Sequence, residues 1–188
     1  MVSLWTATND APARLRPSLS GDIDVDVAIV GAGYTGLWTA YHLRQADPTL
    51  RVALCEAETV GFGASGRNGG WCSSFFAGAK AATEKAHGRE AVVAMQRAMY
   101  ATLDAIEAVV RDEQIDCDWA RGGTLNVATL PVHVARLRHE LNELRAYGFD
   151  EGDHRWLDAA EAGERIGFPS VLGALYTPHT AAIHPAKL

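Results

Sequence analysis

The sequence lacks a long apolar run. Nowhere in its 188 residues does a stretch approach the roughly 18 apolar residues of a membrane-spanning helix, so we expect no membrane partner. We also expect no secretory leader, because residues 1–22 mix Trp5 with prolines and charges and have no apolar centre. Basic character is missing too. The net charge of −6 gives no electrostatic reason to expect a nucleic-acid partner.

Cysteine is scarce and histidine is dispersed. The three cysteines, Cys55, Cys72 and Cys117, form no CxxC pair, which argues against a dithiol-type reductase. They are few, odd in number and widely spaced, which argues against a disulfide framework and favours a cytoplasmic location. Cys72 is expected to be a buried, unreactive thiol, because no base partner is evident. The seven histidines show no metal-ligand spacing, so no metal site is expected, and the isolated His179 and His184 are predicted to lie at the surface or in turns.

What the sequence does contain is a strand, a glycine turn, a helix and a second strand near its beginning. Residues 25–30 form a short apolar run suited to a central parallel strand. Residues 35–46 are expected to form a helix that Asp47-Pro48 ends, and 51–56 the second strand, which closes on an acid. This order predicts a βαβ unit that binds a dinucleotide.

Each residue of the glycine turn has its own predicted role. Gly31 permits the tight turn, Gly33 lets the backbone approach a pyrophosphate, and Gly36 lets the helix pack closely on the sheet. The helix N-terminus offers N–H groups to the phosphates, and Glu56 is placed to accept hydrogen bonds from the adenosine ribose. The candidate nucleotide-binding residues of this segment are Gly31, Gly33, Tyr34, Thr35, Gly36 and Glu56.

A second glycine-rich segment, residues 61–70, follows the second strand and contains five glycines. Ordering such a segment carries a large entropic cost, so it is either a flexible linker or a backbone that must run close to a ligand. A linker has no need of Arg67 and Asn68 in its middle, which favours the ligand-binding interpretation.

Beyond residue 80 helices alternate with single strands, and no second βαβ pattern occurs. Apolar residues at a spacing of three and four predict a long amphipathic helix over 90–113, and Pro131 and Gly148 predict the start and end of another. Strands are predicted over 123–128 and 172–177, and a new helix is predicted to begin at His184-Pro185. The apolar face of the long helix is predicted to comprise Val92, Met95, Met99, Leu103, Ile106 and Val110.

The predicted fold class is α/β: an incomplete Rossmann-type βαβ unit followed by the start of an α+β domain. A doubly wound sheet needs several more parallel strands than this sequence supplies. We therefore expect a missing C-terminal half or a partner chain, although a short native protein is an alternative. The predicted organisation is an N-terminal arm over 1–24, a nucleotide-binding segment over 25–80, and a helical and α+β segment, the start of a substrate domain, over 81–188.

A family resemblance rests on two segments, which read DVAIVGAGYTGLWTAYHL and LCEAETVGFGASGRNGGW. They resemble the FAD-dependent oxidoreductases of the D-amino-acid oxidase-like superfamily, most closely those of the gamma-glutamylputrescine oxidoreductase type. The resemblance implies a two-domain flavoenzyme with FAD as its cofactor and a small-molecule amine or amino acid as its substrate. It further implies that the C–N bond is oxidised by transfer of a hydride equivalent to flavin N5.

The resemblance also implies roles for individual residues. Gly31, Gly33 and Gly36 would line the FAD pyrophosphate, and Glu56 would hold the adenosine ribose. Arg67 would offset negative charge on the phosphates or the reduced flavin, although a salt bridge that fixes the loop is an alternative role. No catalytic residue is identified. The loop residues implied to run past the pyrophosphate towards the flavin ring are Ser65, Arg67, Asn68, Gly69 and Gly70.

Two alternatives belong to other functional classes. A nicotinamide-dependent dehydrogenase would also use the glycine turn and Glu56, but it has no use for the GASGRNGG stretch that follows. A truncated, non-catalytic nucleotide-binding remnant is the other alternative. Because the nucleotide domain is incomplete, we expect the isolated chain to retain flavin weakly or not at all.

Overall fold

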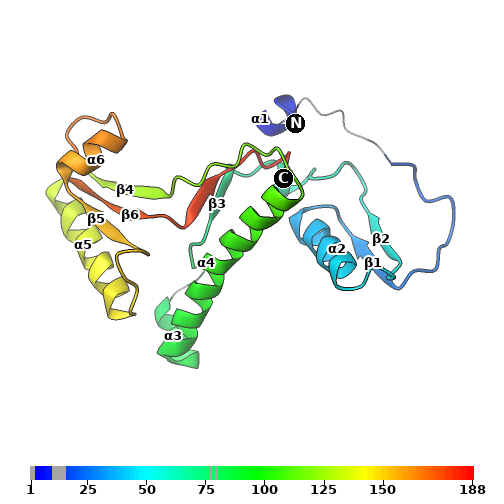
Figure 1. The fold of residues 1–188 in the computed structure, drawn as a ribbon, viewed down its shortest axis with the longest axis horizontal. Coiled ribbons are helices and arrows are strands. Elements are labelled where there is room, and N and C mark those ends of the chain that lie inside the picture. Colours follow the sequence, from blue (N-terminus) through cyan, green and yellow to red (C-terminus); the bar gives the residue numbers. More distant parts are fainter. Residues whose placement is uncertain (1–2, 10–15, 77, 79) are drawn as a thin grey trace. The chain divides into compact units, whose positions relative to one another are not determined.

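The computed structural model describes residues 3–9, 16–76, 78 and 80–188. Backbone contacts divide the chain into two compact units, and Figure 1 shows their helices and strands. Unit 1 extends to Gly70 and also includes His184–Leu188, whereas unit 2 comprises Trp71–Ile183.

Unit 1 contains the predicted βαβ element. Strands β1 and β2 are parallel neighbours, with Val27 opposite Val52 and Val30 opposite Cys55, so this prediction is confirmed. A bidentate ion pair aligns the two strands where they begin, because Arg51 donates to both carboxylate oxygens of Asp26, at 3.1 and 2.8 Å. This hydrogen bonding lowers the pKa of Asp26 to about 2. The elements are α1 (Leu4–Ala7), β1 (Val27–Val30), α2 (Tyr34–Ala46), β2 (Val52–Cys55) and the 3-10 turn η1 (Ala64–Gly66).

The sheet of unit 1 has an uncovered apolar position. Burial alternates along β1, and Val30 at its end is 93% exposed. Within the described residues β2 is the only strand that pairs with β1. A parallel sheet is ordinarily covered on both faces, so this two-stranded piece has the character of part of a larger sheet.

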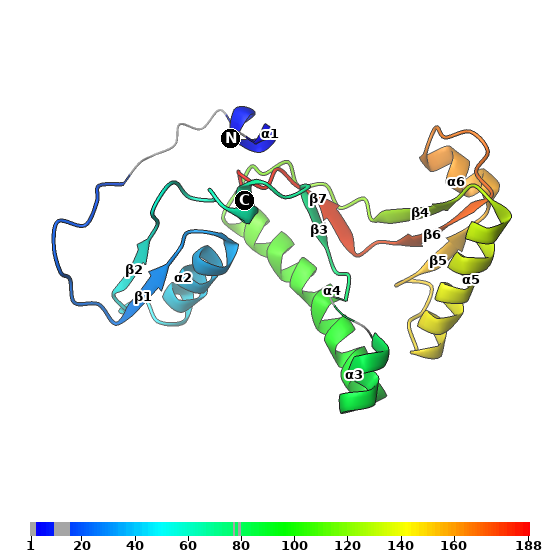
Figure 2. The ribbon, with the colours of Figure 1, turned by 180° about the vertical axis from the view of Figure 1, so that it is seen from behind.

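Unit 2 is built on antiparallel sheets. In one sheet β6 lies between β4 and β5, and in the other β3 pairs with β7, as Figure 2 shows. Helix α5 packs against all three strands of the first sheet, and α6 packs against β5 and β6. The elements are β3 (Trp71–Ser73), α3 (Lys80–His87), α4 (Arg89–Asp112), β4 (Thr124–Ala128), α5 (Pro131–Ala146), β5 (Arg155–Leu157), α6 (Ala159–Arg165), β6 (Gly173–Thr177) and β7 (Thr180–Ala182).

The hydrophobic core of unit 2 lies between α4, α5 and the three-stranded sheet. Its centre is Phe149, which is 1% exposed. A second cluster forms where α6 packs on β5 and β6, around Leu157, Ala162 and Ala174. The buried members of the main cluster are Tyr100, Leu141, Leu144, Phe149 and Leu175.

The long amphipathic helix is confirmed as α4, but its buried face differs from the predicted one. Met95 is 52% exposed, and its neighbour Gln96 is buried instead. Gln96 is satisfied there because its Nε2 donates to the carbonyl oxygen of Ser74 at 2.8 Å. A hydrophobic pattern cannot reveal a buried amide of this kind. The buried residues of α4 are Val92, Gln96, Tyr100, Leu103 and Val110.

Helix α5 begins and ends as predicted. Pro131 occupies its first turn, where the missing N–H costs nothing. Gly148 has a positive φ of 91° after the last turn. The N–H groups of Gly148 and Phe149 donate to the carbonyls of Arg145 and Leu144, at 2.9 and 3.2 Å, which is a Schellman ending. The predicted strands over 123–128 and 172–177 are confirmed as β4 and β6.

The last residues, where the sequence predicts the start of a helix at His184-Pro185, form a turn. The N–H groups of Lys187 and Leu188 both donate to the carbonyl of His184, at 3.0 and 3.4 Å, and the second bond has the spacing of a helical turn. The carbonyl of Pro185 accepts a hydrogen bond from the hydroxyl of Tyr34 at 2.7 Å. The N-terminal arm contains the helical turn α1, which Ser3 caps.

No helix in the described ranges is long and apolar enough to cross a membrane. Within the same ranges, no group of three or more His, Cys, Asp or Glu side chains is arranged to hold a metal ion. The three cysteines are unpaired. Cys72 is only partly buried, not fully buried as predicted, and this burial raises the pKa of its thiol.

Candidate functional site

The turn between β1 and α2 carries the first three predicted site residues. Gly31 has a φ of 97°, a conformation that favours glycine, and its N–H donates to the carbonyl of Cys55 at 2.7 Å. Gly33 is the N-cap of α2, and the first helical hydrogen bond runs from the N–H of Leu37 to its carbonyl at 3.0 Å. Amides earlier in the helix therefore lack helical partners and face outward from its N-terminus.

Gly36 sets how closely α2 approaches this turn. A Cβ placed on Gly36 would lie 2.1 Å from the carbonyl oxygen of Gly31 and 3.2 Å from Ile29 Cγ2. Any other residue would force the helix away from the strand. Gly33 is less constrained, because its Cβ would lie 3.0 Å from the hydroxyl of Ser65. The predicted packing role of Gly36 is thus visible in the backbone.

Glu56 follows β2 and is held beside the turn. One carboxylate oxygen accepts the N–H of Ala32 at 2.8 Å, and the other accepts the N–H of Glu58 at 3.0 Å. These backbone hydrogen bonds, with that of Ala32 the stronger, lower the pKa of Glu56. Each oxygen keeps further acceptor capacity, and the side chain is partly exposed, so it remains able to accept hydrogen bonds from hydroxyl groups of a ligand.

The glycine loop, residues 61–70, is folded against the same turn. Gly61 donates its N–H to the carbonyl of Ala32 at 2.9 Å, and Ser65 Oγ accepts the N–H of Tyr34 at 2.9 Å. The loop is tight, because a Cβ on Gly66 would lie 2.4 Å from the carbonyl oxygen of Gly61. The structure therefore brings Ser65 to the N-terminus of α2, where the turn and Glu56 also lie.

The other predicted site residues of the loop make different contacts. Asn68 braces the loop, since its Nδ2 donates to the carbonyl of Ser65 at 2.7 Å and its Oδ1 accepts the N–H of Gly70 at 2.8 Å. The exposed guanidinium of Arg67 lies 4.5 Å from the ring centre of Phe62. Among the described residues it forms no ion pair, so the loop-fixing salt bridge is not seen. Gly69 is exposed, and so is Thr35, in the first turn of α2.

Together these residues fit a diphosphate. Gly31 and Gly33 leave the backbone of the turn without side chains of its own, a cation lies on the adjoining loop, and the carboxylate of Glu56 lies beside the turn. The N–H groups of Ala32 and Tyr34 are bonded to Glu56 and Ser65 in this structure. The space between Gly36 and the carbonyl oxygen of Gly31 is too small for a side chain.

Comparison with known proteins identifies the family. Residues 26–188 match the family model described as "FAD dependent oxidoreductase", DAO. The chain belongs to this family. FAD is its cofactor, which agrees with the residues at the glycine turn and disfavours the nicotinamide alternative. The predicted resemblance and the predicted incomplete α/β fold are confirmed.

Three similar proteins are longer than this chain. Gamma-glutamylputrescine oxidoreductase of Escherichia coli (strain K12) is 33% identical over 171 residues, which cover 91% of this chain and 39% of that protein. Glycine oxidase of Bacillus cereus ATCC 14579 aligns with a TM-score of 0.63 at 22% identity, over 87% of this chain and 41% of the other. L-alpha-glycerophosphate oxidase of Mycoplasma pneumoniae, solved with FAD bound, aligns with a TM-score of 0.60 at 20% identity. The alignment covers 87% of this chain and 40% of the other. The chain thus spans about 40% of the length of these relatives.

Unit 2 contains a polar cluster that the sequence did not predict. Asp153, 5% exposed, accepts a hydrogen bond from Arg97 at 2.7 Å and lies 3.2 Å from His179 Nε2. Burial alone would raise the pKa of Asp153, but these hydrogen bonds outweigh it and lower the pKa. The ring of His179 stacks on Tyr100 at 3.6 Å, and burial raises the pKa of the Tyr100 hydroxyl.

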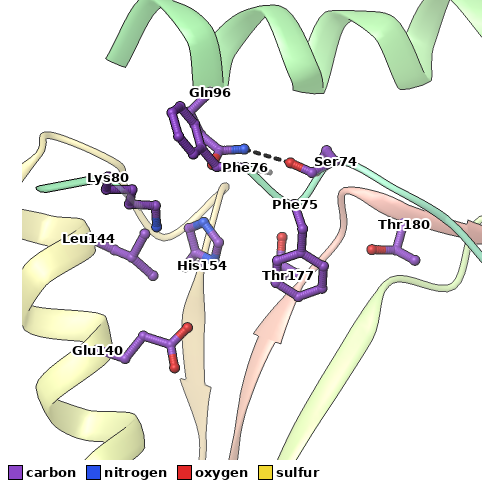
Figure 3. Close-up of a pocket in the computed structure, with 10 residues that line it drawn as sticks. All are labelled: Ser74, Phe75, Phe76, Lys80, Gln96, Glu140, Leu144, His154, Thr177 and Thr180. Atoms are coloured by element: carbon purple, nitrogen blue, oxygen red, sulfur yellow. Dashed lines mark hydrogen bonds between the residues drawn. The ribbon is translucent and has the colours of Figure 1, made fainter. Parts of the chain in front are cut away.

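A small cavity lies beside this cluster and is shown in Figure 3. His154 lines it and bonds through Nε2 to the hydroxyl of Tyr100 at 2.8 Å, and burial lowers the pKa of His154 to about 4. The cavity volume is about 70 Å³, far below that of cofactor sites. Its lining comprises Ser74, Phe75, Phe76, Lys80, Gln96, Glu140, Leu144, His154, Thr177 and Thr180.

The expectation that His179 and His184 lie at the surface or in turns is right about the backbone but wrong about burial. Both lie outside helices and strands, yet His184 is 5% exposed and His179 is largely covered by Tyr100 and Asp153. Their partners are remote in the sequence, so spacing carried no signal. The pairing of the buried Asp153 with His179, 26 positions away in the sequence, is visible only once the fold is known.

Proposed function

We propose that this chain provides the FAD-binding turn and the start of the substrate domain of an oxidoreductase that oxidises a C–N bond of a small-molecule amine or amino acid. The observation that carries the proposal is the position of Glu56, which two backbone amides hold beside the glycine turn. The similarity to gamma-glutamylputrescine oxidoreductase of Escherichia coli supports the substrate class.

The glycine turn would hold the pyrophosphate. The amides at the N-terminus of α2 would donate to phosphate oxygens. Gly31 and Gly33 would let the backbone come close to the pyrophosphate, and Gly36 lets the helix pack closely on the turn. Tyr34 and Thr35 lie in the first helical turn and would contribute their backbone positions.

Glu56 would accept hydrogen bonds from the two hydroxyls of the adenosine ribose. Its lowered pKa keeps it ionised, which makes these hydrogen bonds charge-assisted. The same negative charge would repel the additional phosphate of NADP, so Glu56 favours a cofactor with a free ribose.

The glycine loop would run past the pyrophosphate towards the flavin ring of the cofactor. Ser65, Gly69 and Gly70 offer backbone or hydroxyl groups, and Asn68 keeps the loop closed. The exposed guanidinium of Arg67 would offset negative charge on the phosphates or the reduced flavin.

When bound, FAD supplies the two-electron acceptor, and in the proposed reaction a hydride equivalent passes from the substrate carbon to flavin N5. We assign no catalytic residue in this chain. The strands that complete the sheet, and the groups that contact substrate, are proposed to come from a C-terminal half or a partner chain, because the relatives are more than twice as long. We further propose a cytoplasmic location, in keeping with the three unpaired cysteines.

The test is a titration of the purified chain with FAD, followed by flavin fluorescence. We expect weak, saturable binding that is lost on gel filtration. Glu56→Gln should weaken it about tenfold, because a charged acceptor is replaced by a neutral one. Glu58→Gln is the matched control, since it changes a neighbouring acid whose backbone N–H, not its side chain, is used. Absence of saturable binding, or equal loss in both variants, would refute the proposal.

A further inference from the structure

Residues 3–9 form a short arm whose hydrogen bonds end on the glycine loop. Trp5 Nε1 donates to the carbonyl oxygen of Asn68 at 2.6 Å, and Ser3 Oγ donates to the carbonyl oxygen of Gly66 at 2.8 Å. Ser3 Oγ is also the N-cap acceptor of α1. One side chain therefore fixes the helical turn of the arm and joins that turn to the loop.

The arm is anchored on a second side as well. Thr8 Oγ1 lies 3.0 Å from Nε2 of the buried His184, and Asn9 Nδ2 donates to the carbonyl oxygen of Ala186 at 3.2 Å. The ring of Trp5 meets the ring of His184 edge-on at 5.1 Å. Because the arm is bonded both to the glycine loop and to residues 184–186, the indole N–H of Trp5 has a fixed position beside the loop.

A continuous series of hydrogen bonds then leads from the arm to the helix N-terminus. Trp5 holds the backbone of Asn68, and the side chain of Asn68 bonds to Ser65 and Gly70. Ser65 in turn accepts the N–H of Tyr34 in the first turn of α2. The arm thus acts on the same groups that surround the proposed diphosphate site.

We infer that residues 3–9 are a latch that holds residues 61–70 in their ligand-receiving conformation, with Trp5 and Ser3 as positioning residues. A segment with five glycines has many conformations to lose on ordering, and the two hydrogen bonds from the arm restrict them before any cofactor is bound. The inference deepens the proposed function, on which the identity of the ligand rests.

Hydrogen–deuterium exchange of the chain without cofactor tests the latch directly. In peptides covering 61–70, Trp5→Phe and Ser3→Ala should each speed amide exchange about three- to tenfold, the effect of losing one hydrogen bond. Trp5→Phe keeps an aromatic ring against His184 and removes the indole donor. Leu4→Ala is the control in the same helical turn, because Leu4 is 66% exposed and its side chain makes no polar contact. It should leave exchange unchanged.

The latch is refuted if exchange over 61–70 stays within twofold of wild type in both variants, or if Leu4→Ala has the same effect. It is equally refuted if exchange rises evenly across α2 and β2, which would indicate general loss of stability. Titration with FAD separates the two proposals. Faster exchange in a chain that binds no FAD would support the latch and refute the proposed function. FAD binding by the chain, with exchange over 61–70 unchanged in the variants, would support the proposed function and refute the latch.

Discussion

The two units of this molecule are stabilised in different ways. In unit 2, aromatic and aliphatic side chains such as Phe149 and Leu157 are almost fully buried between helices and sheet. In the described part of unit 1, the fully covered apolar side chain is the single methyl group of Ala32, and Val30 is exposed. Unit 1 is held by a parallel strand pair, glycine turns and polar hydrogen bonds instead.

The proposed function would account for this difference. A backbone that must approach a diphosphate cannot carry large side chains at the point of contact, so it forgoes the burial that stabilises a core. Unit 1 should therefore gain stability from binding, because a ligand that binds only the folded state stabilises it. Unit 2 should be insensitive to the cofactor. Four predictions test this comparison.

The largest expected effect is in the core of unit 2. Phe149→Ala should lower the free energy of unfolding by about 3–5 kcal/mol, because it removes a fully buried ring and leaves a cavity. Urea denaturation followed by circular dichroism measures the change. Phe168→Ala is the control, since Phe168 is 58% exposed and should cost less than about 0.5 kcal/mol. Equal losses in the two variants would contradict the assigned core.

The buried polar cluster gives the next effect. Asp153→Asn should cost about 2–3 kcal/mol, because Arg97 and His179 lose a buried charged acceptor. The control is Asp112→Asn, in an exposed pair with Arg111, which should cost less than about 1 kcal/mol. A loss at Asp153 no larger than at Asp112 would show that the cluster contributes nothing.

A matched pair of valines compares the two units directly. Val92→Ala in α4 should cost about 2 kcal/mol, since Val92 is fully buried. Val30→Ala in β1 should change the free energy of unfolding by less than about 0.5 kcal/mol, because Val30 is 93% exposed. A large loss at Val30 in the purified chain would mean that something covers this strand in solution, such as a second copy.

The smallest effect is a loss of stability in mild acid. Burial lowers the pKa of His154 from 6.5 to about 4 and also lowers that of His179, so the unfolded chain binds protons that the folded chain does not. Stability should therefore fall as the pH drops from about 6.5 to 4, by about 1–2 kcal/mol once partial exposure of His154 is allowed for. Protonation of Asp153 lowers stability only at a pH below this range, because its pKa is lowered from 3.8 in the folded chain.

Thermal unfolding measured at several pH values checks this expectation. His154→Gln should flatten the dependence between pH 6.5 and 4, whereas His139→Gln, at an exposed position of α5, should leave it unchanged. A slope that persists unaltered in His154→Gln would assign the acid sensitivity to other groups.

The parts of the fold that were predictable are those encoded locally. The βαβ unit, α4 and α5 are specified by apolar spacing and by residues such as Gly36, Pro131 and Gly148, whose roles do not depend on distant partners. The family resemblance rests on the same local glycine motifs.

The parts that escaped prediction depend on remote contacts. Strands β3, β5 and β7 have three residues each, too few for a periodic pattern. The burial of Gln96 and His179 depends on partners from other elements, and the hydrogen bond from Trp5 to Asn68 joins positions 63 residues apart. The structure brings Ser65 and Glu56 to the glycine turn, and the role of the predicted cofactor-binding residues stays a prediction.

The most direct test of the central claim is nuclear magnetic resonance of the ¹⁵N-labelled chain titrated with FAD. The account predicts shifts of the amide signals of Gly31–Gly36, Glu56 and residues 65–70, while those of Phe149 and Leu175 in the core of unit 2 stay in place. Shifts confined to the cavity around His154, or an unchanged glycine turn at saturating FAD, would contradict it.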